Sequence, residues 1–240
     1  MLKGKKAVIF DLDGTLIDSI GIWNAVDEEL IKRISNEKFD FIDIAKQRDE
    51  QLKRFSNEED MYLEYCGFLK EKYQSELTKQ EIKKIRYEIA NHFLKEKIEY
   101  KSNAEKVLRY LKEKGYTLFI ASTTNDHTIE IYRTENQNIR NKANFDEFFT
   151  AIYSKGAVKN LKPNPDVYEL ILEKHNFLPE ECLIVEDSLI GVEAANRAGI
   201  EVAVIKDKYS DINRDEINQR SNYQFENFEE LYNQIKQEIE

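Results

Sequence analysis

Five short apolar runs, separated by stretches with helical periodicity, constrain the fold of this chain most strongly. The runs are rich in β-branched and aromatic residues and have polar or turn-forming neighbours; they are AVIF (7–10), TLFIA (117–121), FTAIYS (149–154), CLIVE (182–186) and VAVI (202–205). Short runs of this kind are typical of buried strands. Because strands that alternate with helices pair in parallel, the sequence predicts an α/β fold with a Rossmann-like parallel sheet and helices on both of its faces.

Residues 20 to about 97 interrupt this alternation. The block has no strand pattern, but a stripe of apolar residues has helical spacing: Ile22, Trp23, Val26, Leu30, Ile31 and Ile34. The capping-box spacing recurs at Ser56 with Glu59, Thr78 with Glu81, and Ser102 with Glu105. We therefore predict an all-helical domain, residues 19–98, inserted into an α/β core formed by residues 1–18 and 99–240. The segment 135–148 looks long for a connection, and its sequence suggests no structure.

Composition narrows the partners and the location. A chain of 240 residues with 41% hydrophobic content can bury one sizeable core and a smaller second one. The net charge of -10 argues against nucleic acid or an anionic membrane as a partner, and no apolar stretch approaches the ~20 residues of a membrane span. We expect a small-molecule partner and a monomer or homodimer. Cys66 and Cys182 lack metal-ligand spacing, which favours a reduced, cytoplasmic protein.

Polar residues follow several of the predicted strands. Asp11 and Asp13 follow the first strand, Ser122 to Asn125 follow the second, and Glu186-Asp187 follow CLIV. Lys162 precedes a predicted helix in the sequence NLKPNPD. Because ligands bind at the carboxyl ends of parallel strands, we expect these side chains to meet at one edge of the sheet. Carboxylate oxygens suit Mg²⁺, which keeps coordination positions open for phosphate and water.

Each element also has a structural interpretation. Asp-x-Asp before Gly-Thr can be only a turn, and residues 122–125 can form a helix N-cap. Lys162 can be an ordinary loop lysine, and Glu186-Asp187 can stabilise the N-terminus of the next helix. The chemical interpretation is favoured because all four structural interpretations would have to hold together.

In chain order, four segments resemble the motifs of the haloacid dehalogenase superfamily. They are DLDGTLIDS, ASTT, the lysine of LKPNPD, and VEDSLIGVEAA. A helical cap inserted between the first two motifs resembles the subclass that contains β-phosphoglucomutase and phosphoglycolate-type phosphatases. The resemblance covers residues 1–18 and about 99–210, whereas the inserted domain matches only in position and helical character.

The resemblance implies a magnesium-dependent phosphatase that acts on a small phosphorylated metabolite. By this likeness Asp11 is the nucleophile and forms an aspartyl-phosphate, while Asp13 gives a proton to the leaving group and takes one from water. Lys162 and Mg²⁺ would offset the charge repulsion and keep the pKa of Asp11 low.

The resemblance also assigns the ligands. The metal would be bound by Asp11, Asp187 and the backbone carbonyl of Asp13, with Glu186 in direct contact or one shell further out. The phosphate would be held by the Ser122 hydroxyl and by backbone amides, among them those of Leu12 and Thr123.

Two alternatives stay open. A phosphomutase of the β-phosphoglucomutase kind would share Asp11 and Asp13 but needs a second phosphate site in the cap. The basic residues of the cap alternate with acidic ones, as on solvated helix faces, and Gly67 lies inside a predicted helix, so hydrolysis is favoured. A non-catalytic protein that binds phosphorylated ligands is disfavoured because the four motifs are intact.

Overall fold

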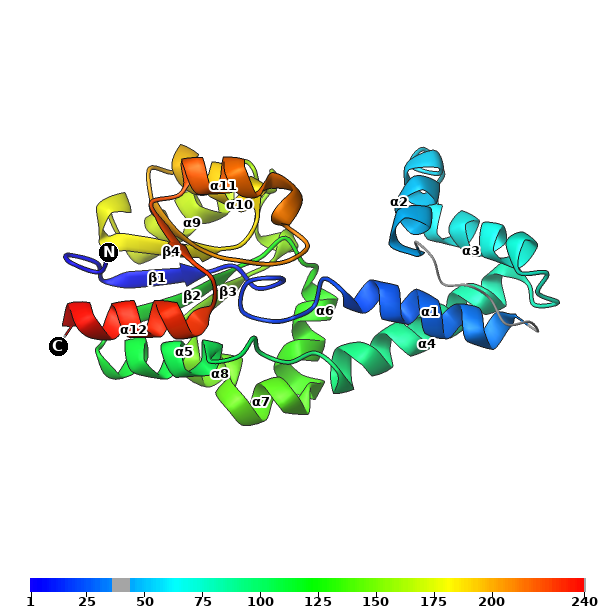
Figure 1. Ribbon diagram of the computed structural model, residues 1–240, viewed down its shortest axis with the longest axis horizontal. Coiled ribbons are helices and arrows are strands. Elements are labelled where there is room, and N and C mark those ends of the chain that lie inside the picture. The colour runs from blue at the N-terminus through cyan, green and yellow to red at the C-terminus, as the bar shows by residue number, and fades with distance from the viewer. Residues whose placement is uncertain (36–43, 240) are drawn as a thin grey trace. The chain divides into compact units, whose positions relative to one another are not determined.

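The computed structural model describes residues 1–35 and 44–239 (Figure 1). The chain divides into two compact units, one formed by Met1–Ile20 with Ile98–Glu240 and the other by Gly21–Lys97. We refer to the first as the core unit and to the second as the helical unit. Among the described residues, no helix combines the length and the apolarity needed to cross a membrane.

The core unit is built on a six-stranded parallel sheet with the order β3-β2-β1-β4-β5-β6. The strands are β1 (Ala7–Phe10), β2 (Thr117–Ala121), β3 (Ala151–Tyr153), β4 (Cys182–Glu186), β5 (Glu201–Ile205) and β6 (Tyr223–Phe225). The predicted Rossmann-like α/β fold is confirmed. Strand β3 is shorter than the predicted run 149–154, and β6 was not predicted, because only three partly exposed residues form it.

Strand β1 lies in the middle of the sheet and is buried along its whole length. Its last residue, Phe10, is in register with Ile120 of β2 and Val185 of β4. From β1 the chain builds outward to β3 on one side and then returns to β4 on the other side. Such a reversal opens a crevice beyond the carboxyl ends of the two strands that flank it, here β1 and β4.

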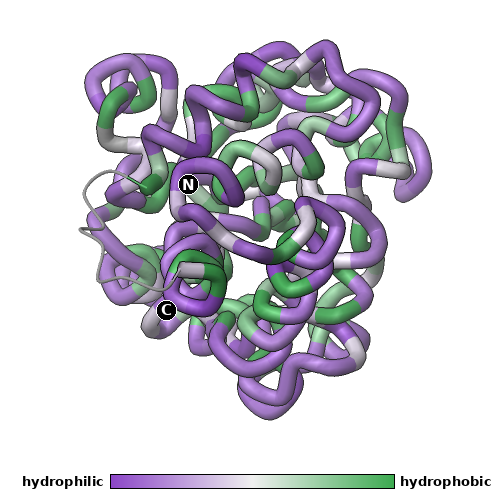
Figure 2. The backbone as a smooth tube through the Cα atoms, turned by 90° about the vertical axis from the view of Figure 1, so that its right-hand side faces the viewer, coloured by the Kyte–Doolittle hydropathy of each residue, from purple (hydrophilic) through white to green (hydrophobic). Residues whose placement is uncertain are grey.

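Helices cover both faces of the sheet (Figure 1). Helices α5 (Ala104–Glu113) and α12 (Phe228–Ile239) pack side by side on one face, and α9 (Asp166–His175), α10 (Leu189–Arg197) and α11 (Arg214–Arg220) lie on the other. Apolar side chains of α9 to α11 share one buried cluster with β1, β2, β4 and β5. The hydropathy pattern in Figure 2 alternates along the helices, as expected where each helix buries one face.

The segment 135–148, for which the sequence suggested no structure, is helical. It follows α6 (Asp126–Glu130) and begins at the end of a π-helical turn (Ile131–Glu135), and it contains α7 (Gln137–Ala143) and α8 (Phe145–Phe148). Asn136 caps α7, because its side chain accepts a hydrogen bond from the Ile139 N–H at 2.9 Å. Ile139 and Phe145 are buried, so these short helices form part of the core.

In its described residues the helical unit consists of α1 (Ile22–Ile34), α2 (Ile44–Arg54), α3 (Met61–Lys72) and α4 (Lys79–Glu96), consistent with the all-helical insertion. The predicted apolar stripe is buried at Val26, Leu30, Ile31 and Ile34. Thr78 and Glu81 form the predicted capping box. The other two capping boxes are wrong, because Asp60 caps α3 through the Leu63 N–H and Asn103 precedes α5 without a side-chain cap.

Two linkers, residues 14–20 and 98–103, join the insertion to the core unit. They pair with each other: Ile17 forms an antiparallel bridge with Tyr100, and the Lys101 N–H donates to the Leu16 carbonyl at 2.8 Å. The Asp18 N–H donates to the Glu99 carbonyl at 3.0 Å. The chain therefore leaves and re-enters the core unit at one point.

Candidate active site

The first candidate residue, Asp11, follows β1 directly. Its backbone N–H continues the β1–β4 pairing by donating to the Val185 carbonyl at 2.9 Å, which fixes the side chain at the carboxyl edge of the sheet. The Lys162 Nζ donates to Asp11 Oδ1 at 2.7 Å, to Glu186 Oε1 at 2.8 Å and to the Ala121 carbonyl at 2.9 Å. The three N–H groups of Lys162 are thus all bonded, and its side chain is only 2% exposed.

Three carboxylates gather around Asp11. Single oxygen atoms of Asp11, Glu186 and Asp187 all lie within 4.8 Å of one another. Asp187 Oδ1 accepts from the Thr15 hydroxyl at 2.8 Å, and its Oδ2 accepts from the Ser210 hydroxyl at 2.7 Å. Asp187 is buried, so the hydroxyl groups of Thr15 and Ser210, and not water, fix the orientation of its carboxylate.

Glu186 is held even more tightly than Asp187. Its Oε2 accepts from the backbone N–H groups of Asp187 at 2.8 Å and of Ser188 at 2.9 Å, at the start of α10. A Cβ atom at position 191 would collide with the Glu186 carboxylate, so the glycine there is required. Ser188, and not Glu186, caps α10 by accepting from the Gly191 N–H at 3.2 Å, so the carboxylate of Glu186 holds the chain just before the helix.

The charges of the cluster do not balance. Burial raises the pKa of Asp11 well above its usual range, and although Lys162 opposes this, Glu186 and Asp187 raise it further. Burial, with the charge of Glu186, also raises the pKa of Asp187 to about 7. Burial lowers the pKa of Lys162, but Asp11 and Glu186 outweigh it, so that the ammonium group stays charged. Lys162 alone does not offset burial and two carboxylates, so the low pKa expected for Asp11 with Mg²⁺ and Lys162 together stays a prediction for the metal-bound site.

This imbalance is an independent indication of a cation. Three buried carboxylates offer hard oxygen ligands around one point, and a divalent ion would favour their ionised forms. Within the described residues, no hydrogen-bond donor reaches Oδ2 of Asp11. The donor set therefore fits Mg²⁺.

The second aspartate, Asp13, has different surroundings. Its carboxylate accepts from the Ser19 hydroxyl at 2.6 Å, from the Thr124 hydroxyl, and from Ser122 and Tyr132 at 3.4 Å each. Gly14, with φ of +88°, turns the chain between Asp13 and Thr15, so that Asp13 faces hydroxyl groups while Thr15 reaches Asp187. The two aspartates of the first motif thus lie in different electrostatic environments.

The remaining predicted residues are placed less directly. Ser122 lies beside Asp13, but the Thr123 side chain is exposed and the Leu12 side chain is buried in the core, so only their backbone amides can serve the site. Asn125, and not Ser122, caps α6 by accepting from the Thr128 N–H at 2.9 Å.

Thr124, one of the polar residues 122–125 expected at this edge, contacts Asp13. Four further contacting side chains were given no role by the sequence: Thr15, Ser19, Tyr132 and Ser210. Thr15 and Ser19 lie inside the first motif and could have been found there. Tyr132 and Ser210 lie outside the motifs, in a π-helical turn and in the loop after β5, and have no local sequence signal.

This fold and this site define a hydrolase class. Residues 8–205 match the sequence profile of the haloacid dehalogenase-like hydrolase family, and the chain belongs to this family. The predicted family is confirmed.

The individual proteins that this chain resembles have low sequence identity to it. The chain is 28% identical over 197 residues, 82% of each chain, to the Phosphorylated carbohydrates phosphatase of Thermotoga maritima. Among crystal structures, a Thermotoga maritima protein provisionally named as a beta-phosphoglucomutase has a TM-score of 0.74 at 24% identity and covers 97% of this chain and 99% of its own. The magnesium-bound YfnB of Bacillus subtilis has a TM-score of 0.69 at 18% identity, with 97% and 99% covered. The two structures show a common fold.

Proposed function

We propose that the protein is a magnesium-dependent phosphatase that hydrolyses a small phosphorylated metabolite through an aspartyl-phosphate on Asp11. One observation carries the proposal: the Asp11 carboxylate lies 2.7 Å from a buried lysine and within 4.8 Å of two more carboxylates, at the switch point of the sheet. The broader class, phosphoric monoester hydrolase, is confirmed by the family match and by relatives named as phosphatases.

The cation would be held by Asp11, Asp187 and the backbone carbonyl of Asp13. When bound, it supplies positive charge to the phosphoryl oxygens and to the ionised carboxylates. Glu186 has partners on both oxygens, which supports a role in holding Lys162 and orienting Asp187.

In the first half-reaction, one oxygen of Asp11 attacks phosphorus. A bond forms between Asp11 and phosphorus, the bond from phosphorus to the leaving oxygen breaks, and that oxygen takes a proton from Asp13. Lys162 bonds to Asp11 and offsets the negative charge that the nucleophile and the phosphate bring together.

In the second half-reaction, water attacks the phosphorus of the aspartyl-phosphate. Asp13 takes a proton from this water, the bond between Asp11 and phosphorus breaks, and inorganic phosphate leaves with Asp11 regenerated. The hydroxyl groups of Ser19 and Thr124 hold the carboxylate of Asp13 and supply its hydrogen bonds.

A screen of phosphorylated metabolites, with released phosphate as the readout, tests the proposal. We expect turnover with Mg²⁺, none with EDTA, and none in Asp11→Asn, whose amide cannot act as the nucleophile. Turnover of any substrate by Asp11→Asn, or full turnover in EDTA, would contradict the proposal.

A phosphomutase stays the second candidate because one structural observation favours it. Arg86 of α4 is not on a solvated face: its Nε donates to the buried Asp27 at 2.8 Å, and its side chain is 7% exposed. Arg48 also contacts Asp27, at 3.3 Å. Arg48 pairs with Asp49 as well, at 3.4 Å, so two carboxylates match the two arginines. The interpretation of the basic residues of the helical unit as solvated is nevertheless wrong for Arg86 and Arg48, whose side chains are 7% and 13% exposed.

A further inference from the structure

The carboxylate of Asp187 is held from two sides. Thr15, from the first motif, donates to Oδ1, and Ser210 donates to Oδ2 at 2.7 Å. Ser210 lies outside the four motifs, between β5 and a short 3₁₀ turn at Asp211–Asn213. Each carboxylate oxygen has two lone pairs, so both oxygens can still bind a cation while the hydroxyl groups fix their direction.

Asp207 shapes the loop that carries Ser210. Its side chain is buried, and its Oδ1 accepts from the Tyr209 N–H at 2.9 Å. Its backbone carbonyl accepts from the Ser210 N–H at 3.0 Å. These bonds fold residues 207–210 into a turn that directs Ser210 toward Asp187.

The other carboxylate oxygen of Asp207, Oδ2, accepts a hydrogen bond from the linker of residues 98–103. The Lys101 Nζ donates to Asp207 Oδ2 at 2.6 Å, and the two side chains are 15% and 6% exposed. Lys101 is itself fixed, because its backbone N–H donates to the Leu16 carbonyl at 2.8 Å in the other linker. A continuous series of bonds therefore runs from the paired linkers to the acidic cluster.

We propose that Lys101, Asp207 and Ser210 are positioning residues that hold the Asp187 carboxylate for the cation. The inference rests on the metal site of the proposed function and goes beyond it in assigning a role to the loop after β5 and to the linker. An ion pair that merely fastened the loop would leave cation binding unchanged. The series of bonds makes the affinity of the cation depend on the ammonium group of Lys101, which donates to Asp207. The positive charge of Lys101 also opposes the rise that burial causes in the pKa of Asp187, which acts in the same direction.

Binding of Mn²⁺ to the metal-free full-length protein, measured by the EPR signal of free Mn²⁺, tests this without any turnover. Ser210→Ala should raise the Kd for Mn²⁺ about 10- to 100-fold, the usual effect of removing a group that orients a metal ligand. Ser210→Thr keeps the hydroxyl group and should bind almost as the wild type does. Ser221→Ala is the matched control, because its hydroxyl group donates to the Asn218 carbonyl, away from the cluster. An unchanged Kd in Ser210→Ala would overturn the proposal.

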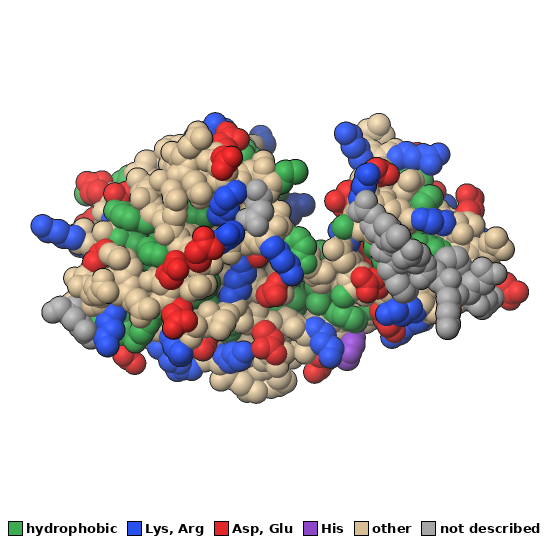
Figure 3. All heavy atoms as spheres, in the orientation of Figure 1, with side chains coloured by type: hydrophobic (Ala, Val, Ile, Leu, Met, Phe, Trp, Pro, Cys, Tyr) green, Lys and Arg blue, Asp and Glu red, His purple; other side chains and the backbone are tan. Residues whose placement is uncertain are grey.

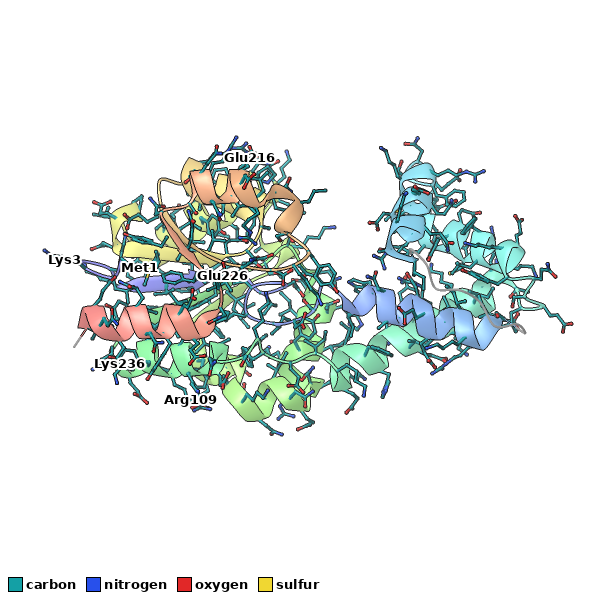
Figure 4. The ribbon with its side chains drawn as sticks, viewed as in Figure 1. Met1, Lys3, Arg109, Glu216, Glu226 and Lys236 are labelled. Carbon is teal, nitrogen blue, oxygen red and sulfur yellow. The ribbon has the colours of Figure 1, made fainter. Side chains whose placement is uncertain are left out.

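The linker is tested in the same way. Lys101→Met should weaken Mn²⁺ binding. In the double variant with Ser210→Ala the Kd should rise by less than the product of the two single effects, since both changes break one series of bonds and only the direct effect of the Lys101 charge on Asp187 is added. Lys206→Met is the control, because Lys206 pairs at 3.1 Å with Glu226, which Figure 4 labels. If Lys101→Met binds Mn²⁺ with wild-type affinity, or if the two fold-changes in Kd simply multiply in the double variant, Lys101 does not act through Ser210. Lys101→Arg keeps the charge and guards against a folding defect.

Asp187→Asn separates this inference from the function on which it rests. If that variant binds Mn²⁺ as the wild type does, the metal site itself is wrong. If it loses binding while Ser210→Ala does not, the metal site stands and the positioning role of Ser210 is refuted.

Discussion

Burial disfavours the ionised form of the Asp187 carboxyl group. A carboxylate must be ionised to bind a metal ion, so the two requirements conflict in the metal-free protein. Its pKa is raised to about 7 by burial and by Glu186, whereas an unfolded aspartate titrates near ~3.9. Between these values the folded protein holds a proton that the unfolded chain has released. The free energy of unfolding of the metal-free protein should therefore fall as pH rises from about 4 to about 7, by up to about 1.4 kcal/mol per pH unit.

Asp187→Asn should reduce this slope and be more stable than the wild type at pH 8 in EDTA. Urea unfolding followed by circular dichroism, at several pH values from 5 to about 8, measures it. Saturating Mg²⁺ should then stabilise the wild type but not the variant. The exposed Asp215→Asn serves as the control. An identical slope in wild type and Asp187→Asn would show that other groups cause the pH dependence.

Asp13 and Asp11 differ in their neighbours, and substrates with good and poor leaving groups should distinguish their roles in catalysis. Asp13→Asn blocks proton transfer, which is typically worth ~10²- to 10⁴-fold in rate. A substrate with a good leaving group, such as p-nitrophenyl phosphate, needs little protonation, so this variant should phosphorylate itself from it faster than from a sugar phosphate. Rapid-quench measurement of phosphoenzyme gives both rates. Equal losses on the two substrates, without phosphoenzyme, would exclude Asp13 as the acid.

At the scale of the elements, two helices contain an internal glycine for different reasons. A Cβ at Gly191 in α10 would collide with the Glu186 carboxylate, whereas a Cβ at Gly67 in α3 would meet only the Lys79 Cδ, at an ordinary 3.5 Å. Gly67→Ala should therefore stabilise the protein by about 0.5–1 kcal/mol, through helix propensity alone.

Gly191→Ala should instead destabilise the protein by about 1–3 kcal/mol, because the site is already filled. It should also lower turnover, since displacing Glu186 releases Lys162 from one of its three acceptors. Chemical unfolding and phosphate release on both variants provide the comparison. A stabilised, fully active Gly191→Ala would show that the carboxylate can move at no cost.

The same scale explains which elements the sequence predicts. The capping box at Thr78 depends on local chemistry and was predicted correctly. The one predicted at Ser56 and Glu59 was wrong, because α3 begins only at Met61 and Asp60 is its N-cap. The short helices α7 and α8, within the segment 135–148, escape prediction because their burial depends on packing against α5. Ser210 and Tyr132 escape for a related reason, since only the folded chain brings their loops to the acids.

At the scale of the whole molecule, one face can be compared with the predicted partners. Lysine and arginine side chains are intermingled with acidic ones over the face shown in Figure 3, in keeping with the predicted small-molecule partner. The four motifs, more than 150 residues apart from first to last, could be placed together from the sequence because strand order dictates which carboxyl ends are neighbours. The substrate could not be predicted, because no short motif in the sequence identifies it.

Hydrolysis and phosphomutase action make different demands on water. A mutase must protect its aspartyl-phosphate until the sugar has turned around, whereas a phosphatase must admit water. With β-glucose 1-phosphate and a trace of the 1,6-bisphosphate, we expect release of free phosphate without an activator requirement. Glucose 6-phosphate and phosphate are followed together. Rapid formation of glucose 6-phosphate with little release of phosphate would instead show that the protein is a phosphomutase. Arg86→Met would then be the first variant to examine.

The pairing of Ile17 with Tyr100 has a consequence for the history of such chains. Because the two linkers that lead into and out of residues 21–97 pair with each other, the insertion begins and ends at adjacent points of the core unit. Such an insertion can be lengthened, shortened or exchanged without a change in the register of any strand, because its two points of attachment to the core unit stay adjacent. Evolution can thus revise the helical unit while the chemistry of β1 and β4 is inherited unchanged.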